Sequence, residues 1–116
     1  MRYPKPVRLS ARKDIDRVFR DGRYRRLGWL NVKVLPNGLH YSRFLVSVTR
    51  KLGKAHLRNR LRRLVREAVR LNRDRLQGGY DLCFYWIAAP AKPGLAAVSA
   101  EVQKLFRELS MSQPPE

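Results

Sequence analysis

The sequence is short of acidic residues and of cysteine, and both shortages narrow what the protein can be. Its 116 residues hold 9 Asp and Glu against 26 Lys and Arg, which gives a formal net charge of +17. Solubility needs far less charge, so a polyanionic partner is expected, and nucleic acid is the default. The one cysteine, Cys83, lies in an apolar run. It is expected to be buried, it leaves no disulfide within the chain, and it suits a reducing cytoplasm.

Long apolar runs and catalytic motifs are also missing. No stretch of 18 apolar residues occurs, and the first ten residues lack the apolar region of a signal peptide, so neither membrane insertion nor secretion is expected. There is no HExxH, no CxxC, no Gly-rich phosphate loop and no close pair of carboxylates, while His40 and His56 stand alone. We expect no catalytic and no metal site in this chain. If it takes part in a reaction, another component supplies the active site.

Residues 50–75 form the most informative stretch, and their spacing predicts an amphipathic helix. The expected core stripe, at alternating spacings of four and three, is Leu57, Leu61, Leu64, Ala68 and Leu71. The opposite side carries Asn59, Arg62, Arg63, Arg66 and Arg70, flanked by Arg58 and Arg60. Guanidinium groups grip phosphate with paired hydrogen bonds, which favours an external polyanion over a merely solvated basic helix.

The remaining pattern predicts one domain over residues 1–116, with an extended arm at 1–8 and a flexible tail at 110–116. A first helix follows Ser10, expected as its N-cap. The basic segment 23–26 is expected to be a loop, which suits a sugar-phosphate contact or is no more than a solvated turn. Strands at 29–35 and 43–49 should pair as an antiparallel hairpin. The basic helix then leads to a buried strand at 81–87, parallel to the second strand, and a last helix is expected around 98–109.

Two features of the sequence are each compatible with more than one structural position and role. Phe19 has helical spacing beside aliphatic residues, which favours a core position, but at the rim of a groove its ring could stack an unpaired base. Lys33, Ser47 and Thr49 would give the sheet a polar face. That face could be open to a ligand, or a helix could cover it.

The central sequence RKLGKAHLRNRLRRLVRE, residues 50–67, closely resembles the signature of the bacterial ribonuclease P protein subunit. That signature is a basic pair, a Gly-x-Ala approach, Arg-Asn-Arg, an aliphatic residue, a second basic pair and Arg-Glu. Leu9, Phe19-Arg20-x-Gly22, Val46-Ser47-Val48 and Asp81 extend the resemblance over most of the chain.

The resemblance implies a ribonucleoprotein that removes the 5′ leader from precursor tRNA by hydrolysing one phosphodiester. It further implies that the RNA subunit is the catalyst and holds the Mg²⁺ ions. One copy of the protein is expected to bind each RNA in the cytoplasm, and no role at DNA or at membranes is expected. The implied fold is an α/β (α+β) sandwich like domain 2 of ribosomal protein S5. It has a small mixed sheet and three helices in α-β-β-α-β-α order, with the basic helix in a βαβ crossover.

The resemblance also implies two groups of contact residues. Those that would bind the RNA subunit are Arg50, Lys51, Lys54, Arg58, Asn59, Arg60, Arg62, Arg63, Arg66 and Arg70. Those that would form a leader-binding cleft between the first helix and the sheet are Phe19, Ile15, Lys33, Ser47 and Thr49. Ile15 stands where the family often has an aromatic residue.

Three other functions fit the charge. A non-catalytic RNA-binding module, such as a small ribosomal protein, agrees in size and composition, and only the long signature argues against it. A DNA-binding helix is less suitable, because arginines along a whole face fit phosphates better than bases. A protein-only nuclease lacks the carboxylates and histidines to hold metal.

Overall fold

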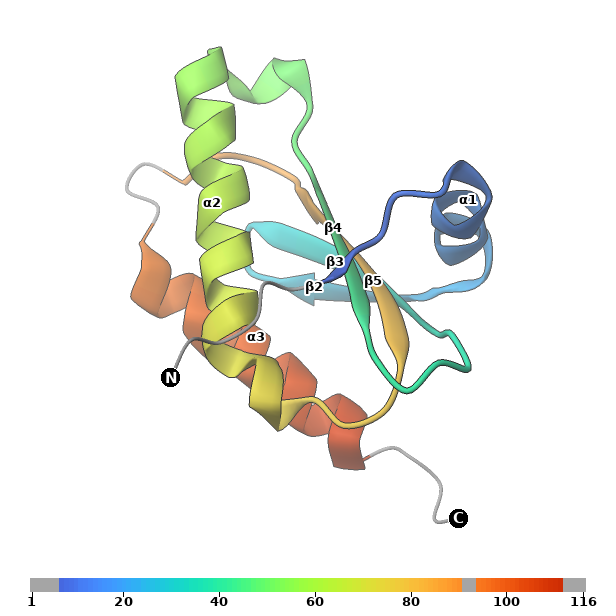
Figure 1. The fold of residues 1–116 in the computed structure, drawn as a ribbon. Helices are drawn as coiled ribbons and strands as arrows, with labels where there is room; N and C mark the ends of the chain where they lie inside the picture. The colour runs from blue at the N-terminus through green and yellow to red at the C-terminus, as the bar shows by residue number, and fades with distance from the viewer. Residues whose placement is uncertain (1–6, 91–93, 112–116) are drawn as a thin grey trace.

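One mixed β-sheet forms the centre of the computed structural model, which describes residues 7–90 and 94–111. Its five strands lie in the order β1-β4-β5-β3-β2. Their bounds are β1 Val7–Arg8, β2 Arg23–Leu27, β3 Leu30–Pro36, β4 Arg43–Ser47 and β5 Tyr80–Trp86. The helices are α1 Arg12–Asp21, α2 Ala55–Asn72 and α3 Leu95–Met111, with short 3-10 turns η1 Arg50–Leu52 and η2 Arg73–Arg75 around α2. Helices α2 and α3 cover one face of the sheet, and α1 lies on the other (Figure 1).

The main core lies between the sheet and the pair α2–α3. Alternation along β3 buries Leu30, Val32 and Val34, as the period of two predicts. The predicted stripe of α3 is confirmed, because Val98, Val102, Leu105 and Phe106 are all buried and Leu109 packs against them. A smaller core under α1 contains Leu9, Val18 and Cys83.

Strand pairing confirms the βαβ unit and contradicts the hairpin. Strands β4 and β5 are parallel, with α2 between them in the chain. However, β5 is inserted between β3 and β4 and pairs with both. The connection from β3 to β4 crosses the end of β5, where the Asn37 N–H donates to the Gly79 carbonyl at 3.1 Å. A turn signal fixes the direction of the next strand but not its neighbour, so the predicted hairpin was wrong.

The basic segment predicted as a loop is instead the edge strand β2. Its register with β3 runs from Arg23 opposite Val34 to Leu27 opposite Leu30. Gly28 follows with a φ of 66°, as expected for the first central residue of a two-residue hairpin turn. Only Leu27 of β2 is buried, so the strand lacks the apolar alternation that would have revealed it. Exposed cations are a usual way to protect a sheet edge.

The ends of the elements differ from prediction in smaller ways. Ser10 was wrong as the N-cap of α1, because Ala11 occupies that position without a side-chain hydrogen bond. The predicted arm is described only at Val7 and Arg8, which form β1, and residues 1–6 lie outside the described part of the chain. Of the predicted tail, Ser110 and Met111 belong to α3, and the rest lies outside the described residues.

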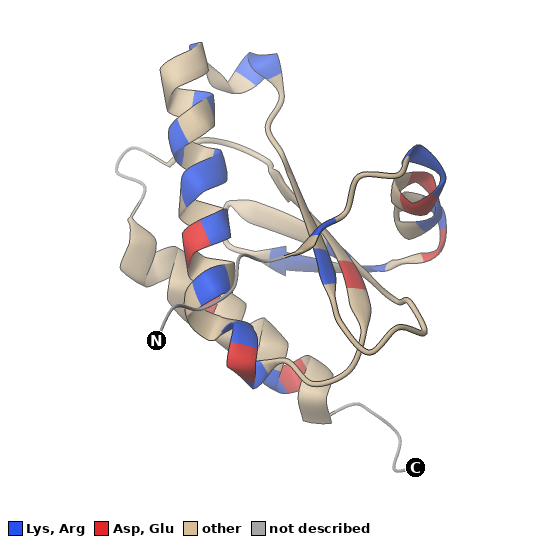
Figure 2. Ribbon diagram, viewed as in Figure 1, with Lys and Arg blue, Asp and Glu red and all other residues tan. Residues whose placement is uncertain are grey.

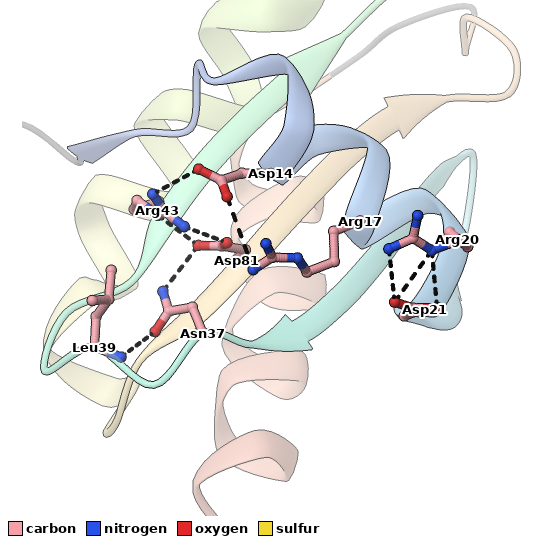
Figure 3. Close-up of polar contacts among 8 residues, drawn as sticks. All are labelled: Asp14, Arg17, Arg20, Asp21, Asn37, Leu39, Arg43 and Asp81. Carbon is pink, nitrogen blue, oxygen red and sulfur yellow. Dashed lines mark hydrogen bonds and ion pairs between the residues drawn. The ribbon is translucent and has the colours of Figure 1, made fainter.

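A partly buried ion-pair network joins α1 to the sheet (Figure 3). Arg43 on β4 donates to both carboxylate oxygens of Asp81 on β5, from Nε at 2.8 Å and from Nη2 at 2.6 Å. Its Nη1 donates to Asp14 on α1 at 3.3 Å. Asn37 donates to Asp81 at 2.9 Å. The hydrogen bonds that Arg43 donates to Asp81 raise the pKa of Arg43 against the opposing effect of burial, so the guanidinium stays charged.

We expect Arg43→Met to lower the free energy of unfolding by about 3–5 kcal/mol, because Asp81 is only 3% exposed and would lose its charged partner. The measurement is urea unfolding followed by circular dichroism. Arg20→Met is the matched control: Arg20 pairs with Asp21 at the surface, where such pairs contribute about 0–1 kcal/mol. Equal losses in both variants would contradict this role for Arg43.

Candidate nucleic-acid interface

The exposed side of α2 carries a dense cationic surface. Arginine recurs along the helix, and Glu67 is its one acidic residue (Figure 2). We define the α2 surface by its exposed members: Asn59, Arg60, Arg63 and Arg66 on the helix, with Arg50, Lys51 and Lys54 just before it. Gly53 enters this turn with a φ of 135°, a backbone conformation that favours glycine. The seven side chains therefore form one surface from the η1 turn into α2.

The buried side of α2 is rotated relative to the predicted stripe. Leu61 and Ala68 are buried as expected, but Val65 and Val69 are buried too, and Leu71 is 50% exposed. The reason is that α2 packs on both the sheet and α3, which needs a wider face than one stripe. Arg60, which was expected on a flank, is exposed together with Arg63. Arg58, Arg62 and Arg70 are half-buried at the boundary.

Internal partners satisfy only part of this charge. Arg62 donates to the Asn59 side chain at 2.9 Å, and Arg70 forms an ion pair with Glu67. The hydrogen bond from Arg70 lowers the pKa of Glu67. Within residues 7–90 and 94–111, no carboxylate lies within ion-pair distance of the three exposed arginines Arg60, Arg63 and Arg66. These guanidinium groups are free to bind phosphate.

On the other side of the sheet, α1 covers only part of the face. It packs through Val18, with Ile15 half-buried, against Leu9, Cys83 and Leu45. Beyond that small core, side chains in register leave what we call the open face: Asn31 and Lys33 on β3, Tyr85 on β5 and Ser47 on β4. Ser47 is exposed, and the other three are half-buried.

Phe19 lies at the rim of the open face rather than in the core. Its side chain is 38% exposed, and its ring centroid is 5.7 Å from that of Tyr85 at an interplanar angle of 48°. The Nζ of Lys33 donates to the Phe19 carbonyl at 2.8 Å. The structure thus brings Phe19 and Lys33 together. Ile15 lies in the small core, and Thr49 is exposed beyond the end of β4.

The sequence did not indicate which aromatic residue of β5 would join the open face. Tyr85 does so, whereas Trp86 is buried on the opposite side, where its Nε1 donates to the Leu61 carbonyl at 3.1 Å. Burial, and then the neighbouring Tyr24 hydroxyl, raise the pKa of Tyr85, so its hydroxyl stays protonated. Tyr24 donates to Asn31 at 2.7 Å. Apart from Asp81, the residues of β5 are apolar or aromatic, so only the register reveals the face on which each of them lies.

The described residues contain neither a cluster of metal ligands nor a membrane-spanning helix. Within residues 7–90 and 94–111, no group of three or more His, Cys, Asp or Glu side chains could hold a metal ion. Over the same residues, no helix is long and apolar enough to cross a membrane. An arginine-rich helix on one side of a sheet, and aromatic, amide and lysine side chains on the other, are features of an RNA-binding protein.

Comparison with known proteins identifies the family. The family model described as Ribonuclease P matches residues 3–110, so the chain belongs to the ribonuclease P protein family. It is 39% identical over 105 residues to the ribonuclease P protein component of Clostridioides difficile strain 630, covering 90% of this chain and 92% of that protein. The corresponding component of Roseiflexus castenholzii is 38% identical over 108 residues, covering 91% and 88%.

Solved structures agree with the fold. The ribonuclease P protein from Thermotoga maritima superposes with a TM-score of 0.75 at 29% identity, covering 87% of this chain and 96% of that one. The Staphylococcus aureus protein gives 0.73 at 22% identity, covering 91% and 96%, which supports the fold alone. Family membership gives the chain a role in tRNA processing by ribonuclease P, with the ribonuclease P RNA as its partner. Family membership therefore supports the function in ribonuclease P over that of a small ribosomal protein.

Cys83 lies beneath α1, so the reactivity of its thiol reports whether α1 stays packed on the sheet. Burial, with the nearby charge of Asp81, raises the pKa of the Cys83 thiol to about 12, so a thiol reagent at pH 8 should modify the folded protein only slowly. Asp14→Asn weakens the pairing with Arg43, and we expect it to speed modification several-fold by loosening α1.

Asp16→Asn is the matched control for this experiment, because Asp16 lies on the same helix but its ion-pair partner within residues 7–90 and 94–111 is Arg12, at 3.8 Å on the surface. The rate of reaction with a chromogenic disulfide reagent measures the effect. Identical rates for the two variants would contradict a role of Asp14 in holding α1 on the sheet.

Proposed function

We propose that this chain is the non-catalytic protein subunit of ribonuclease P and that it binds two RNA segments on opposite sides of its sheet. The α2 surface binds the ribonuclease P RNA, and the open face binds the single-stranded 5′ leader of precursor tRNA. The observation that carries the proposal is the separation of these surfaces by the whole thickness of the sheet and its core. One small protein can then hold two polyanions together.

The chemistry of the α2 surface suits a folded RNA. Exposed arginines without carboxylate partners neutralise phosphates and release counterions, which favours binding irrespective of base sequence. Asn59 accepts from Arg62 through its side-chain oxygen, so its amide N–H groups remain available as donors. The α2 surface therefore provides both charge and directed hydrogen bonds.

The chemistry of the open face suits an unpaired strand. The exposed ring of Phe19 beside Tyr85 offers a place for a base to stack, at a contribution of roughly 1–3 kcal/mol per base. Lys33 supplies positive charge next to it, with Ser47 exposed on the neighbouring strand. A base-paired stem does not present its base faces in this way, so the surface selects single-stranded RNA.

Catalysis is assigned to the RNA partner. In this proposal the RNA subunit holds the Mg²⁺ ions that promote hydrolysis of the phosphodiester, and this chain contributes positioning and charge neutralisation. One copy of the protein acts with one RNA, in the cytoplasm, and without a role at DNA.

The two surfaces should separate by mutation. We expect Arg60→Ala to weaken binding of the ribonuclease P RNA about tenfold while leaving the affinity for leader RNA nearly unchanged. Phe19→Ala should weaken binding of leader RNA and leave the affinity for the ribonuclease P RNA nearly unchanged. It removes a stacking ring from the open face and does not alter the charge of the α2 surface. Filter-binding titrations with each RNA measure both affinities.

Arg107→Ala is the control for loss of one exposed arginine, since Arg107 lies on α3, away from both surfaces. If Arg60→Ala and Phe19→Ala reduced both affinities equally, the protein would have one RNA site rather than two.

A further inference from the structure

The open face continues past β3 onto the edge strand β2. Strand register places Arg26 opposite Asn31, Asn31 opposite Tyr85, and Tyr85 opposite Ser47, so these four side chains form one row across the sheet. In the next row, Tyr24 lies opposite Lys33. Directly opposed residues point to the same face, and Tyr24 and Arg26 therefore share a face with Lys33 and Tyr85.

We propose that Tyr24 and Arg26 form an outer subsite for the RNA single strand, in which a base stacks on Tyr24 and a phosphate binds Arg26. The inference rests on the proposed function, because it lengthens the leader path from Phe19 and Tyr85 to the edge of the sheet. It assigns a ligand to β2, the strand that the sequence pattern did not reveal.

Tyr24 has the properties of a stacking platform. Its side chain is 51% exposed, while its hydroxyl is held by the hydrogen bond to Asn31 at 2.7 Å. A ring that is fixed at one end and open on its surface loses little conformational freedom when a base stacks on it. The hydroxyl of Tyr24 also joins the ring to the row that contains Tyr85, which continues the aromatic surface.

Arg26 has the properties of a phosphate contact. Its Nε donates to the Gly28 carbonyl at 3.1 Å, which orients the guanidinium at the β2–β3 turn. Within residues 7–90 and 94–111, no carboxylate lies within ion-pair distance of Arg26. Its terminal N–H groups are thus available for an anion.

The other arginines of β2 face away from this path. Arg25 forms an ion pair with Glu108 of α3 at 2.5 Å, and Arg23 lies opposite Val34, a residue of the main core. The strand therefore divides its charge between two faces. Only Tyr24 and Arg26 point toward the proposed RNA path, and Arg23 is an exposed arginine on the same strand that can serve as a control.

The dimensions suit a short single strand. Three inter-strand steps separate β4 from β2, which is about 14 Å at roughly 4.8 Å per step. At the stacked spacing of about 3.4 Å per nucleotide in one strand, this corresponds to roughly four nucleotides. A leader that reaches only Phe19 and Tyr85 would leave Tyr24 and Arg26 unused, so the contribution of the outer subsite must depend on leader length.

The test measures the dissociation constant of the assembled ribonuclease P holoenzyme for precursor tRNAs whose leaders are lengthened one nucleotide at a time. For the unmodified protein we expect affinity to increase until the strand reaches β2. Tyr24→Ala and Arg26→Ala should each abolish the last part of this gain, about five- to tenfold, and bind short leaders normally. Tyr24→Phe keeps the ring and should retain most of the gain, and Arg23→Ala should retain all of it.

Salt dependence separates the two contacts. Arg26→Ala should reduce the slope of log affinity against log salt concentration by about 0.7 for long leaders, as expected for one lost single-strand phosphate contact. Tyr24→Ala should leave the slope unchanged. Circular dichroism of each variant confirms that it is folded before binding is measured.

Three results would overturn the outer subsite. If Tyr24→Ala and Arg26→Ala followed the unmodified protein at every leader length, β2 would be only a solvated sheet edge. If both variants lost affinity equally at all lengths, including precursors without a leader, these residues would act elsewhere. A holoenzyme whose affinity did not depend on leader length at all would instead refute the proposed leader site, and with it the extension.

Discussion

The buried carboxylate of Asp81 is the constraint on which the arrangement of this protein depends. A charge removed from water must be paired and hydrogen-bonded, and Arg43 satisfies it with two hydrogen bonds at 2.8 and 2.6 Å. Because the remaining nitrogen of Arg43 reaches Asp14, the same guanidinium ties β4, β5 and α1 together. The position of α1 on the sheet is thus set by charge pairing as well as by its small apolar core.

That position leaves the far side of the sheet only partly covered. Helix α1 buries Cys83 and its neighbours, and Phe19 in its last turn is exposed at the border of the uncovered part. Had a long apolar helix covered this face, Lys33 and Asn31 would have been buried beneath it at considerable cost. The polar residues Asn31 and Lys33 of β3 and the short, weakly apolar α1 are therefore consistent with one another, and together they produce an open face.

The fold was largely predictable from periodicity, and the exceptions have physical causes. The three helices, the strands β3, β4 and β5 and the parallel β4–β5 pair follow from apolar spacing. The insertion of β5 between β3 and β4 did not, because strand neighbours depend on long-range packing that local turn signals do not encode. Strand β2 was missed because RYRR has no apolar alternation, and the buried face of α2 was misplaced because contact with α3 widens it toward Val65 and Val69.

The candidate site was predictable only in part for the same reason. Arginine spacing predicted the α2 surface, whereas the participation of Tyr24, Asn31 and Tyr85 in the open face depends on strand register. Phe19 could not be assigned from spacing, since a helix presents the same pattern whether its aromatic residue lies in a core or at its rim. Phe19 lies at the rim because the small apolar core under α1 does not extend far enough to cover it. The extent of that core is a property of the tertiary structure.

The most direct test of the central claim, that this protein assists an RNA catalyst without a catalytic site of its own, is a cleavage assay. A precursor tRNA with an intact 5′ leader is incubated with a bacterial ribonuclease P RNA at low Mg²⁺, with and without the protein, and also with the protein alone. We predict that cleavage at the mature 5′ end requires the RNA and is strongly stimulated by the protein. Cleavage by the protein alone, or no stimulation of a compatible RNA by folded protein, would contradict the account.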